Sequence, residues 1–214
     1  MAVTELLLSD FEVRRPDGVA LYTLRERRFR PGFTALTGPN GSGKSTLLNS
    51  LAGINRRSQG TVILDGVDRS RDPRGYARRM AFQPQNFSGY PEMSGFAFLV
   101  YLLRLRGAGR GEARDLAASG LAAVGLLDAD VALWAYSQGM LQRLGIAYVV
   151  LSGAPLALLD EPFAGIDPPG RAMLLDWLEP LAADRILIIC THHVDELIDR
   201  GAGQLDLGAA GSEA

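Results

Sequence analysis

The chain has 214 residues, of which 47% are apolar and 21% charged, and its net charge is −2. This composition is typical of a folded chain with a substantial core and excludes extended disorder. The chain lacks the marked positive charge of a general nucleic-acid binder. Its single cysteine, Cys190, excludes an internal disulfide and a cysteine-rich zinc site. The longest apolar run, Phe96 to Leu103, is far shorter than the about 20 residues of a membrane span.

The first part of the chain predicts a β subdomain. Short strands are expected at Thr4 to Leu8 and Phe33 to Leu36. Six arginines lie between them: Arg14, Arg15, Arg25, Arg27, Arg28 and Arg30. We favour the solvated face of an edge strand for these arginines over a phosphate-binding or membrane-binding patch.

A glycine-rich loop follows Leu36 and precedes an expected helix, Thr46 to Ala52. Its sequence from Gly38 to Ser45 matches the phosphate-loop pattern G-x-x-x-x-G-K-[ST] in full. Glycines let the backbone wrap a phosphate chain, and the following helix adds its positive dipole end. The ammonium of Lys44, the only lysine, would neutralise the outer phosphates, and the Ser45 hydroxyl would bind Mg²⁺. The candidate nucleotide-binding residues are Gly38, Pro39, Asn40, Gly41, Ser42, Gly43, Lys44, Ser45 and Thr46.

The remaining elements indicate an α/β sheet that is mainly parallel. Residues 86–145 have helical spacing and few β-branched residues, which predicts an inserted helical subdomain. Buried strands are expected at Leu156 to Leu159 and Ile186 to Cys190, with a helix at Gly170 to Ala182 between them. Ligands of such sheets bind at the carboxyl ends of the strands.

Two carboxylates follow the first of these buried strands. Asp160 at the strand end could hold Mg²⁺, and Glu161 could polarise a water molecule for in-line attack on a γ-phosphate. Carboxylates end many buried strands, so this motif is specific only in combination with the phosphate loop. The pair of motifs would also fit a GTPase, a kinase or a motor protein.

The order of five further residues decides among these classes. The residues are Gln85, Ser137, Gly139, Asp167 and His192. With the two motifs above, they make residues 3–200 resemble the ATP-binding-cassette (ABC) ATPases. The resemblance implies a single P-loop NTPase domain over 1–214. Its nucleotide-binding core, which includes the antiparallel β subdomain, would comprise 1–85 and 150–208, and its helical subdomain 86–149.

The resemblance also implies a role for each of these residues. Gln85 would contact Mg²⁺ and the attacking water, and His192 would hydrogen-bond the γ-phosphate. Ser137 and Gly139 would close on the ATP of a second subunit, and Asp167 would communicate across that dimer. The implied catalytic residues are then Glu161, His192 and Lys44. The implied metal-binding residues are Ser45, Gln85 and Asp160, with ATP and Mg²⁺ as cofactors.

The sequence departs from the family pattern at two places. The signature commonly reads Leu-Ser-Gly-Gly-Gln, whereas here Gln138 lies between Ser137 and Gly139; we count Gln138 among the nucleotide-binding candidates. The aromatic residue that usually stacks on adenine would fall at residues 14–16, which are Arg14, Arg15 and Pro16. An arginine could stack through its guanidinium plane, or Phe11 or Tyr22 could approach instead.

Four residues outside these motifs have ordinary structural interpretations. Cys190 is expected in a buried strand and His193 at the surface. Trp134 and Trp177 are expected to pack in the core or the helical subdomain.

The segment Gln85 to Ser94, followed by Phe96 to Gly107, resembles ATPase subunits of natural-product and peptide exporters. The resemblance implies an ATPase that energises a separate transmembrane subunit, pairs with a second ATPase subunit and sits peripherally at the cytoplasmic face of the cell membrane. No nucleic-acid partner is expected. Two alternatives stay open: an ATPase subunit for cytochrome c maturation, and a soluble ABC-type assembly ATPase without a membrane partner.

Overall fold

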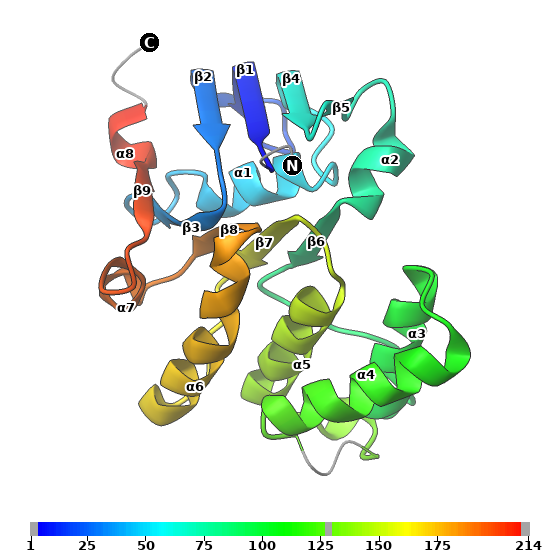
Figure 1. Cartoon of the computed structure of the whole chain (residues 1–214). Coiled ribbons are helices and arrows are strands. Elements are labelled where there is room, and N and C mark those ends of the chain that lie inside the picture. Colours follow the sequence, from blue (N-terminus) through cyan, green and yellow to red (C-terminus); the bar gives the residue numbers. More distant parts are fainter. Residues whose placement is uncertain (1–3, 127–129, 211–214) are drawn as a thin grey trace. The chain divides into compact units, whose positions relative to one another are not determined.

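Two compact units make up the part of the chain that the computed structural model describes, residues 4–126 and 130–210 (Figure 1). The first unit combines the chain up to Phe82 with Ala154–Glu161 and the segment from Ala182 onward. The second combines Gln83–Gly153 with Pro162–Leu181.

An antiparallel sheet with strand order β2-β1-β4-β5 forms one layer of the first unit. Its strands are β1 (Leu6–Arg14), β2 (Ala20–Phe29), β4 (Gln59–Leu64) and β5 (Val67–Asp68). Burial alternates along β1, as expected for a strand with one face on a core. Strand β2 lies at the edge, and the side chains of Arg25, Arg27 and Arg28 are exposed on it. This confirms the solvated edge strand for these three arginines, whereas Arg14 lies half-buried on β1, inside the edge.

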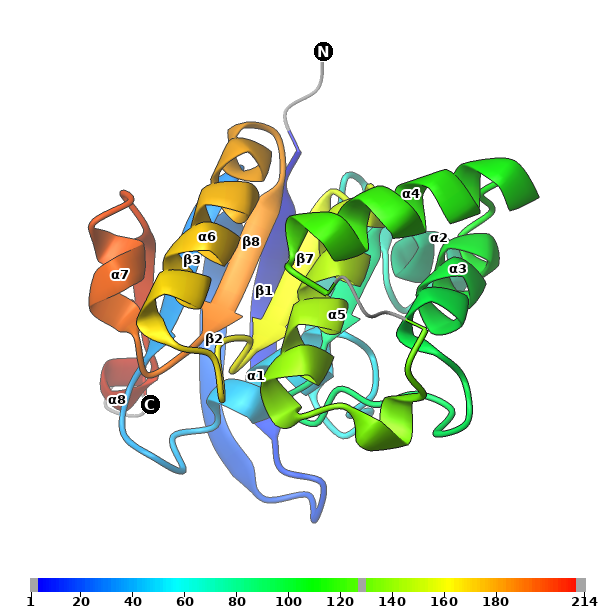
Figure 2. The same ribbon diagram turned by 90° about the horizontal axis from the view of Figure 1, so that it is seen from below.

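A second sheet of the first unit has the strand order β6-β7-β8-β3-β9. Its strands are β3 (Gly32–Thr37), β6 (Met80–Gln83), β7 (Leu156–Asp160), β8 (Ile186–Cys190) and β9 (Gly203–Asp206). The pairs β3–β8, β3–β9 and β7–β8 are parallel, and Figure 2 shows β3, β8 and β7 side by side. All residues of β7 and β8 are buried, which explains their continuous apolar sequences.

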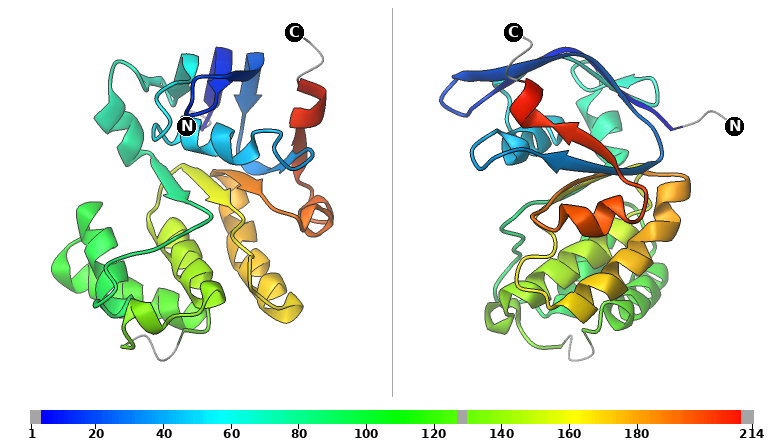
Figure 3. Two further views of the ribbon diagram at one scale, coloured as in Figure 1. Left: turned by 180° about the vertical axis from the view of Figure 1, so that it is seen from behind. Right: turned by 90° about the vertical axis from the view of Figure 1, so that its left-hand side faces the viewer.

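Helix α1 (Lys44–Leu51) lies between the two sheets of the first unit, where it contacts β1 and β7 (Figure 3). Its residues Leu47, Leu48 and Leu51 are fully buried in the core that both sheets share. The shorter helices of this unit are α2 (Pro73–Arg78), α7 (Val194–Ile198) and α8 (Leu207–Ala210). Because α1 begins directly after the glycine-rich loop, this packing fixes the loop against the sheet.

The second unit is helical. Its α-helices are α3 (Gly95–Leu105), α4 (Arg110–Ala123), α5 (Gln138–Leu151) and α6 (Pro168–Leu178). The 3₁₀ helix η1 (Leu133–Ala135) precedes α5, and η2 (Glu179–Ala183) continues α6. Helix α4 packs on α3 and α5. The Ser94 and Ser137 hydroxyls cap α3 and α5 by accepting hydrogen bonds from the backbone N–H groups of Ala97 and Met140.

The α/β class, with a mainly parallel core, an antiparallel β subdomain and an inserted helical subdomain, is confirmed. The helix expected at Gly170 to Ala182 instead starts at Pro168, because proline is well suited to the first helical turn. It turns into η2 at Glu179, immediately before Pro180, which lacks the N–H of an α-helical bond. The expectation that Trp134 packs internally is wrong: it is 75% exposed on η1. Among the described residues, no helix is both long enough and apolar enough to cross a membrane.

Candidate functional site

The glycine-rich loop joins β3 to α1 in the first unit. Gly38, Gly41 and Gly43 all have positive φ angles, 131°, 83° and 94°, which favour glycine. A Cβ atom at Gly43 would lie 2.7 Å from Leu21 Cδ1, and although the leucine tip could move, the positive φ angle would still strain a larger residue. The loop therefore requires glycine for its shape.

Lys44 lies across this loop. Its Nζ donates hydrogen bonds to the backbone oxygens of Gly38 at 2.8 Å and Pro39 at 3.1 Å. The hydroxyl oxygen of Ser42 is buried and has no hydrogen-bond partner. A cation and an unsatisfied hydroxyl in one glycine-rich loop suit the oxygens of a phosphate group.

Ser45 and Asp160 meet at the start of α1 and the end of β7. The Ser45 Oγ donates a hydrogen bond of 3.0 Å to Asp160 Oδ1. Asp160 is only 2% exposed, and burial raises the pKa of its carboxyl, although hydrogen bonds from Ser45 and Cys190 and the charge of Lys44 oppose this rise. The two side chains bring together hard oxygen atoms of the kind that Mg²⁺ prefers as ligands.

Glu161 and His192 follow the neighbouring parallel strands β7 and β8. The Glu161 Oε1 lies 3.3 Å from His192 Nε2, and the backbone N–H of Glu161 donates to the Cys190 oxygen at 2.8 Å. Glu161 has a φ of 49°, in the left-handed region that non-glycine residues seldom adopt. Strain of this kind is often found in functional sites. His192 is well exposed, whereas the Glu161 side chain is largely buried.

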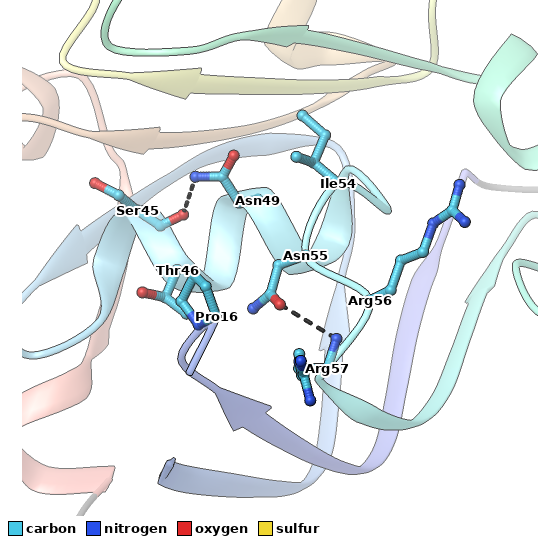
Figure 4. A pocket seen from close by; sticks show the side chains of 8 residues that line it. All are labelled: Pro16, Ser45, Thr46, Asn49, Ile54, Asn55, Arg56 and Arg57. Carbon is cyan, nitrogen blue, oxygen red and sulfur yellow. Dashed lines mark hydrogen bonds between the residues drawn. The ribbon is translucent and has the colours of Figure 1, made fainter. Parts of the chain in front are cut away.

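A pocket of about 600 Å³ adjoins the loop in the first unit (Figure 4). It is lined by Pro16, Ser45, Thr46, Asn49, Ile54, Asn55, Arg56 and Arg57. The amide of Asn49 donates to the Ser45 oxygen, and Asn55 Oδ1 accepts from the Arg57 backbone. None of the lining side chains is aromatic. The sequence analysis did not single out Asn49, which lies on α1, or Asn55, Arg56 and Arg57, which form a polar stretch a few residues after that helix.

The aromatic alternatives for base stacking are wrong. Phe11 is fully buried in the core of the first unit. Tyr22 is 6% exposed, and its hydroxyl donates to the Gly43 oxygen. The Arg14 guanidinium binds the Gly18 oxygen and Glu12, and Arg15 pairs with Asp17. Among residues 14–16, only Pro16 lines the pocket.

The second unit brings together Ser137, Gly139 and Asp167. Ser137 caps α5 and is exposed, as is Gln138. Gly139 is buried against the loop before α6, where an added Cβ would lie 2.5 Å from the Gly165 oxygen. Arg143 Nη2 lies 3.5 Å from Asp167 Oδ1, and its Nη1 donates to the Val124 oxygen. Arg143 and Gly165 therefore hold the start of α5 against the Asp167 loop; the sequence reasoning gave neither a role.

Gln85 belongs to the second unit, whereas Ser45 and Asp160 belong to the first. Its side chain is exposed, and its backbone oxygen accepts a hydrogen bond from Gln142. The expected contact between Gln85 and a metal stays a prediction. Cys190 is buried in β8 as expected, and His193 is half-buried at the start of α7, 3.8 Å from Glu196.

Comparison with known proteins gives a consistent result. Residues 29–164 match the family model described as "ABC transporter". The daunorubicin/doxorubicin resistance ATP-binding protein DrrA of Streptomyces peucetius is 36% identical over 75% of this chain and 49% of its own length. The linearmycin resistance ATP-binding protein LnrL of Bacillus subtilis is 30% identical over 81% of this chain and 57% of its own.

Two further proteins extend the comparison. The taurine import ATP-binding protein TauB of Chromobacterium violaceum is 34% identical over 85% of this chain and 67% of its own length. The ATP-binding cassette MJ0796, solved as a dimer in a post-hydrolysis state with ADP and Pi, has a TM-score of 0.82 at 21% identity and is covered over 95% of both chains. The chain spans about half the length of the first curated relatives it matches.

Proposed function

The chain belongs to the ABC transporter family as an ATP-binding-cassette ATPase, and from this premise we propose that it energises a separate membrane subunit of an exporter. The observation that carries the proposal is the arrangement in the first unit. Lys44 lies across the glycine-rich loop, Ser45 contacts Asp160, and Glu161 contacts His192. The same site thus holds side chains that can bind phosphate, bind a metal ion and accept a proton.

The loop binds the triphosphate of ATP through backbone N–H groups at the start of α1. Lys44 Nζ, which donates to two backbone carbonyls, gains stronger acceptors in phosphate oxygens that carry full negative charge. The unpartnered Ser42 hydroxyl can donate to the same oxygens.

The residues near Asp160 fit Mg²⁺. Ser45 and Asp160 supply two hard oxygen ligands, and phosphate oxygens and water would complete the coordination. Within residues 4–126 and 130–210, no three His, Cys, Asp or Glu side chains cluster as a metal site, so the metal would bind together with the nucleotide. Bound Mg²⁺ would neutralise charge on the β- and γ-phosphates.

Glu161 is the proposed general base. It takes a proton from water as the water oxygen bonds to the γ-phosphorus and the bond from that phosphorus to the β-phosphate oxygen breaks, which yields ADP and phosphate. His192, 3.3 Å from Glu161 Oε1, orients this carboxylate and offers an exposed ring for the γ-phosphate.

Exposed Ser137 and the start of α5 support the proposed dimer. They would close on the ATP bound by a second ATPase subunit, which is either another copy of this chain or a close relative. Closure of the two ATPase subunits would move the membrane subunit, and hydrolysis would let the two ATPase subunits separate again. Attachment to that subunit would place the chain at the cytoplasmic face of the cell membrane.

The pocket beside α1 is the proposed place of the nucleoside half of ATP. It shares Ser45 and Thr46 with the phosphate loop, so a nucleotide bound there can reach it. Pro16 and Ile54 offer apolar surface, and the exposed guanidinium groups of Arg56 and Arg57 can stack on a base.

Relatives named for drug resistance favour export, whereas TauB is named for import. The cytochrome c maturation ATPase and the soluble assembly ATPase stay as alternatives. These three functions can be distinguished by the proteins that co-purify with the tagged chain from membranes of its own cells. ATPase assays of the purified complex then show whether the partner raises turnover. A transport subunit that raises turnover supports the proposal, and a haem-handling or soluble scaffold partner contradicts it.

Nucleotide binding is tested by calorimetric titration of Lys44→Ala with Mg-ATP. We expect loss of at least about tenfold in affinity, because a charge-assisted phosphate contact contributes about 1.5–3 kcal/mol. Arg74→Ala, which removes an exposed charge from α2, is the matched control and should leave affinity unchanged. Unchanged affinity in Lys44→Ala would contradict the assignment of the phosphate loop.

A further inference from the structure

The pocket beside α1 is built from three segments of the first unit (Figure 4). Ser45, Thr46 and Asn49 lie on α1, Pro16 lies in the turn between β1 and β2, and residues 54–57 form the loop that follows α1. The shape of the pocket therefore depends on how the turn and the loop are held against α1.

Asn55 contacts all three of these segments. Its backbone N–H donates to the Asn49 oxygen at 3.0 Å, which ties the loop to α1. Its side-chain Nδ2 donates to the Arg14 backbone oxygen at 2.6 Å, just before the turn, and to the Ser50 hydroxyl of α1 at 3.0 Å. Its Oδ1 accepts from the Arg57 backbone N–H at 3.2 Å (Figure 4). An amide has two hydrogens to donate, and Asn55 uses both within the protein.

Two serine hydroxyls extend this network to the phosphate loop. The Arg14 backbone N–H donates to Ser58 Oγ at 3.0 Å, the Ser58 and Ser50 hydroxyls are 2.8 Å apart, and Ser50 Oγ donates to the Thr46 oxygen at 2.6 Å. Because Ser50 has a single hydroxyl hydrogen, which goes to Thr46, Ser58 is the donor to Ser50. Ser50 is 0% and Ser58 7% exposed, so water competes little for these bonds.

The network acts beyond the end of the strand pairing. The register of β1 with β4 ends at the pair Glu12–Gln59, two residues before Arg14. Residues 15–19 then form a turn that is hydrogen-bonded within itself through two backbone bonds of 2.8 Å. The contacts of Asn55 therefore help to determine where this turn lies relative to α1.

We propose that Asn55 is a positioning residue that preorganises the pocket for the nucleoside half of ATP and so raises nucleotide affinity without touching the nucleotide. This inference rests on the proposed function, which places the nucleoside in this pocket. A site that is already ordered binds more tightly than one that must be ordered on binding. The triphosphate, held by Lys44 and the phosphate loop, does not depend on Asn55.

The test compares Asn55→Leu with the wild-type chain for two ligands, Mg-ATP and inorganic tripolyphosphate with Mg²⁺, by calorimetric titration. Tripolyphosphate carries the phosphates without the nucleoside. Leucine has a side chain of similar size and removes the donor and the acceptor of the amide. We expect the affinity for ATP to fall at least tenfold, whereas the affinity for tripolyphosphate should stay within threefold of wild type.

The ratio of the two affinities is a readout that a merely structural role would not change. Val62→Ala, a buried change on β4 of the same unit, is the control. It should lower the free energy of unfolding in urea melts and leave both affinities unchanged. If Asn55→Leu does not fold, Asn55→Ala, which adds no apolar branch, replaces it, with the same expected ratio.

The outcomes separate this inference from the proposed function. Equal losses of affinity for ATP and tripolyphosphate in Asn55→Leu, or no loss for either, overturn the positioning role alone. A wild-type chain that binds tripolyphosphate as tightly as ATP overturns the placement of the nucleoside in the pocket and this inference with it. A wild-type chain that binds neither ligand overturns the proposed function itself.

Discussion

Ser45 Oγ donates a hydrogen bond of 3.0 Å to Asp160 Oδ1, although the two residues are 115 positions apart in the chain. The contact exists because α1 packs on β7, so the start of the helix and the end of the strand meet. Ser45→Ala should lower ATP affinity at least about tenfold in the presence of Mg²⁺, because alanine lacks the hydroxyl oxygen that is proposed to bind the metal. With a chelator present, the two proteins should bind ATP alike. Titration under both conditions checks this.

Ser45→Thr is the control for that experiment, since threonine keeps the hydroxyl and should keep Mg-dependent affinity within threefold. Equal losses with and without Mg²⁺ would show that Ser45 acts on the phosphates or on folding rather than on the metal.

The reactivity of the single cysteine, Cys190, tests whether strand β8 is buried. Burial raises the pKa of the Cys190 thiol well above its ordinary value, so the folded chain holds it as an unreactive thiol. At pH 8 we expect a disulfide reagent to label the folded protein at least about 100-fold more slowly than the unfolded protein. Labelling of the folded chain as fast as in denaturant would contradict burial of β8.

The same shift gives a pH dependence. In the unfolded chain the thiol ionises at about pH 8.5, whereas in the folded chain it stays protonated. Above that pH the unfolded state therefore binds fewer protons than the folded state, and the free energy of unfolding falls as the pH rises. The contribution of Cys190 to stability is therefore complete below that pH and lost above it. Cys190→Ala should lower the free energy of unfolding at pH 7 through lost packing, and the gap to wild type in urea melts should narrow between pH 8 and 10.

Gly139 tests the contact between α5 and the loop before α6. An added methyl would lie 2.5 Å from the Gly165 backbone oxygen, so Gly139→Ala must displace the start of α5. We expect ATP affinity within threefold of wild type and an ATPase rate at least about tenfold lower, which corresponds to about 1.4 kcal/mol in the barrier. Gly111→Ala on α4, where an added methyl meets open space, is the control and should leave both values unchanged.

Gln138 is exposed at the first residue of α5. Because its side chain points into solvent and the Ser137 hydroxyl alone caps the helix, Gln138→Gly should keep the ATPase rate within about tenfold. If Gln138→Gly has no measurable ATPase activity, the Gln138 side chain is required for hydrolysis.

The sequence predicts the parts of the fold and site that short stretches specify. The phosphate loop needs glycine at Gly38, Gly41 and Gly43, and the continuous apolar runs of β7 and β8 mark buried parallel strands. The ends of those strands then place Asp160, Glu161 and His192 at one edge of the sheet.

Contacts between distant segments are not visible in such patterns. Phe11 and Tyr22 have the aromatic character of a base-stacking residue, but both are buried in the core of the first unit. The bond from Gln142 to Gln85 depends on the way α5 packs on a segment 57 positions earlier, and no local periodicity signals it. Trp134 has the apolar surface of a core residue, yet the short η1 helix leaves it exposed.

The central claim is that ATP bound by one chain is completed by Ser137 of a second subunit. Light scattering of Glu161→Gln with and without Mg-ATP, beside the double variant Glu161→Gln/Ser137→Arg, tests it most directly. We expect Glu161→Gln to bind ATP without hydrolysing it and to dimerise only with ATP. The double variant should bind ATP with the same affinity and remain monomeric, because its arginine blocks the second subunit and not its own nucleotide. A double variant that loses ATP affinity as a monomer, or that dimerises like Glu161→Gln, would contradict the account.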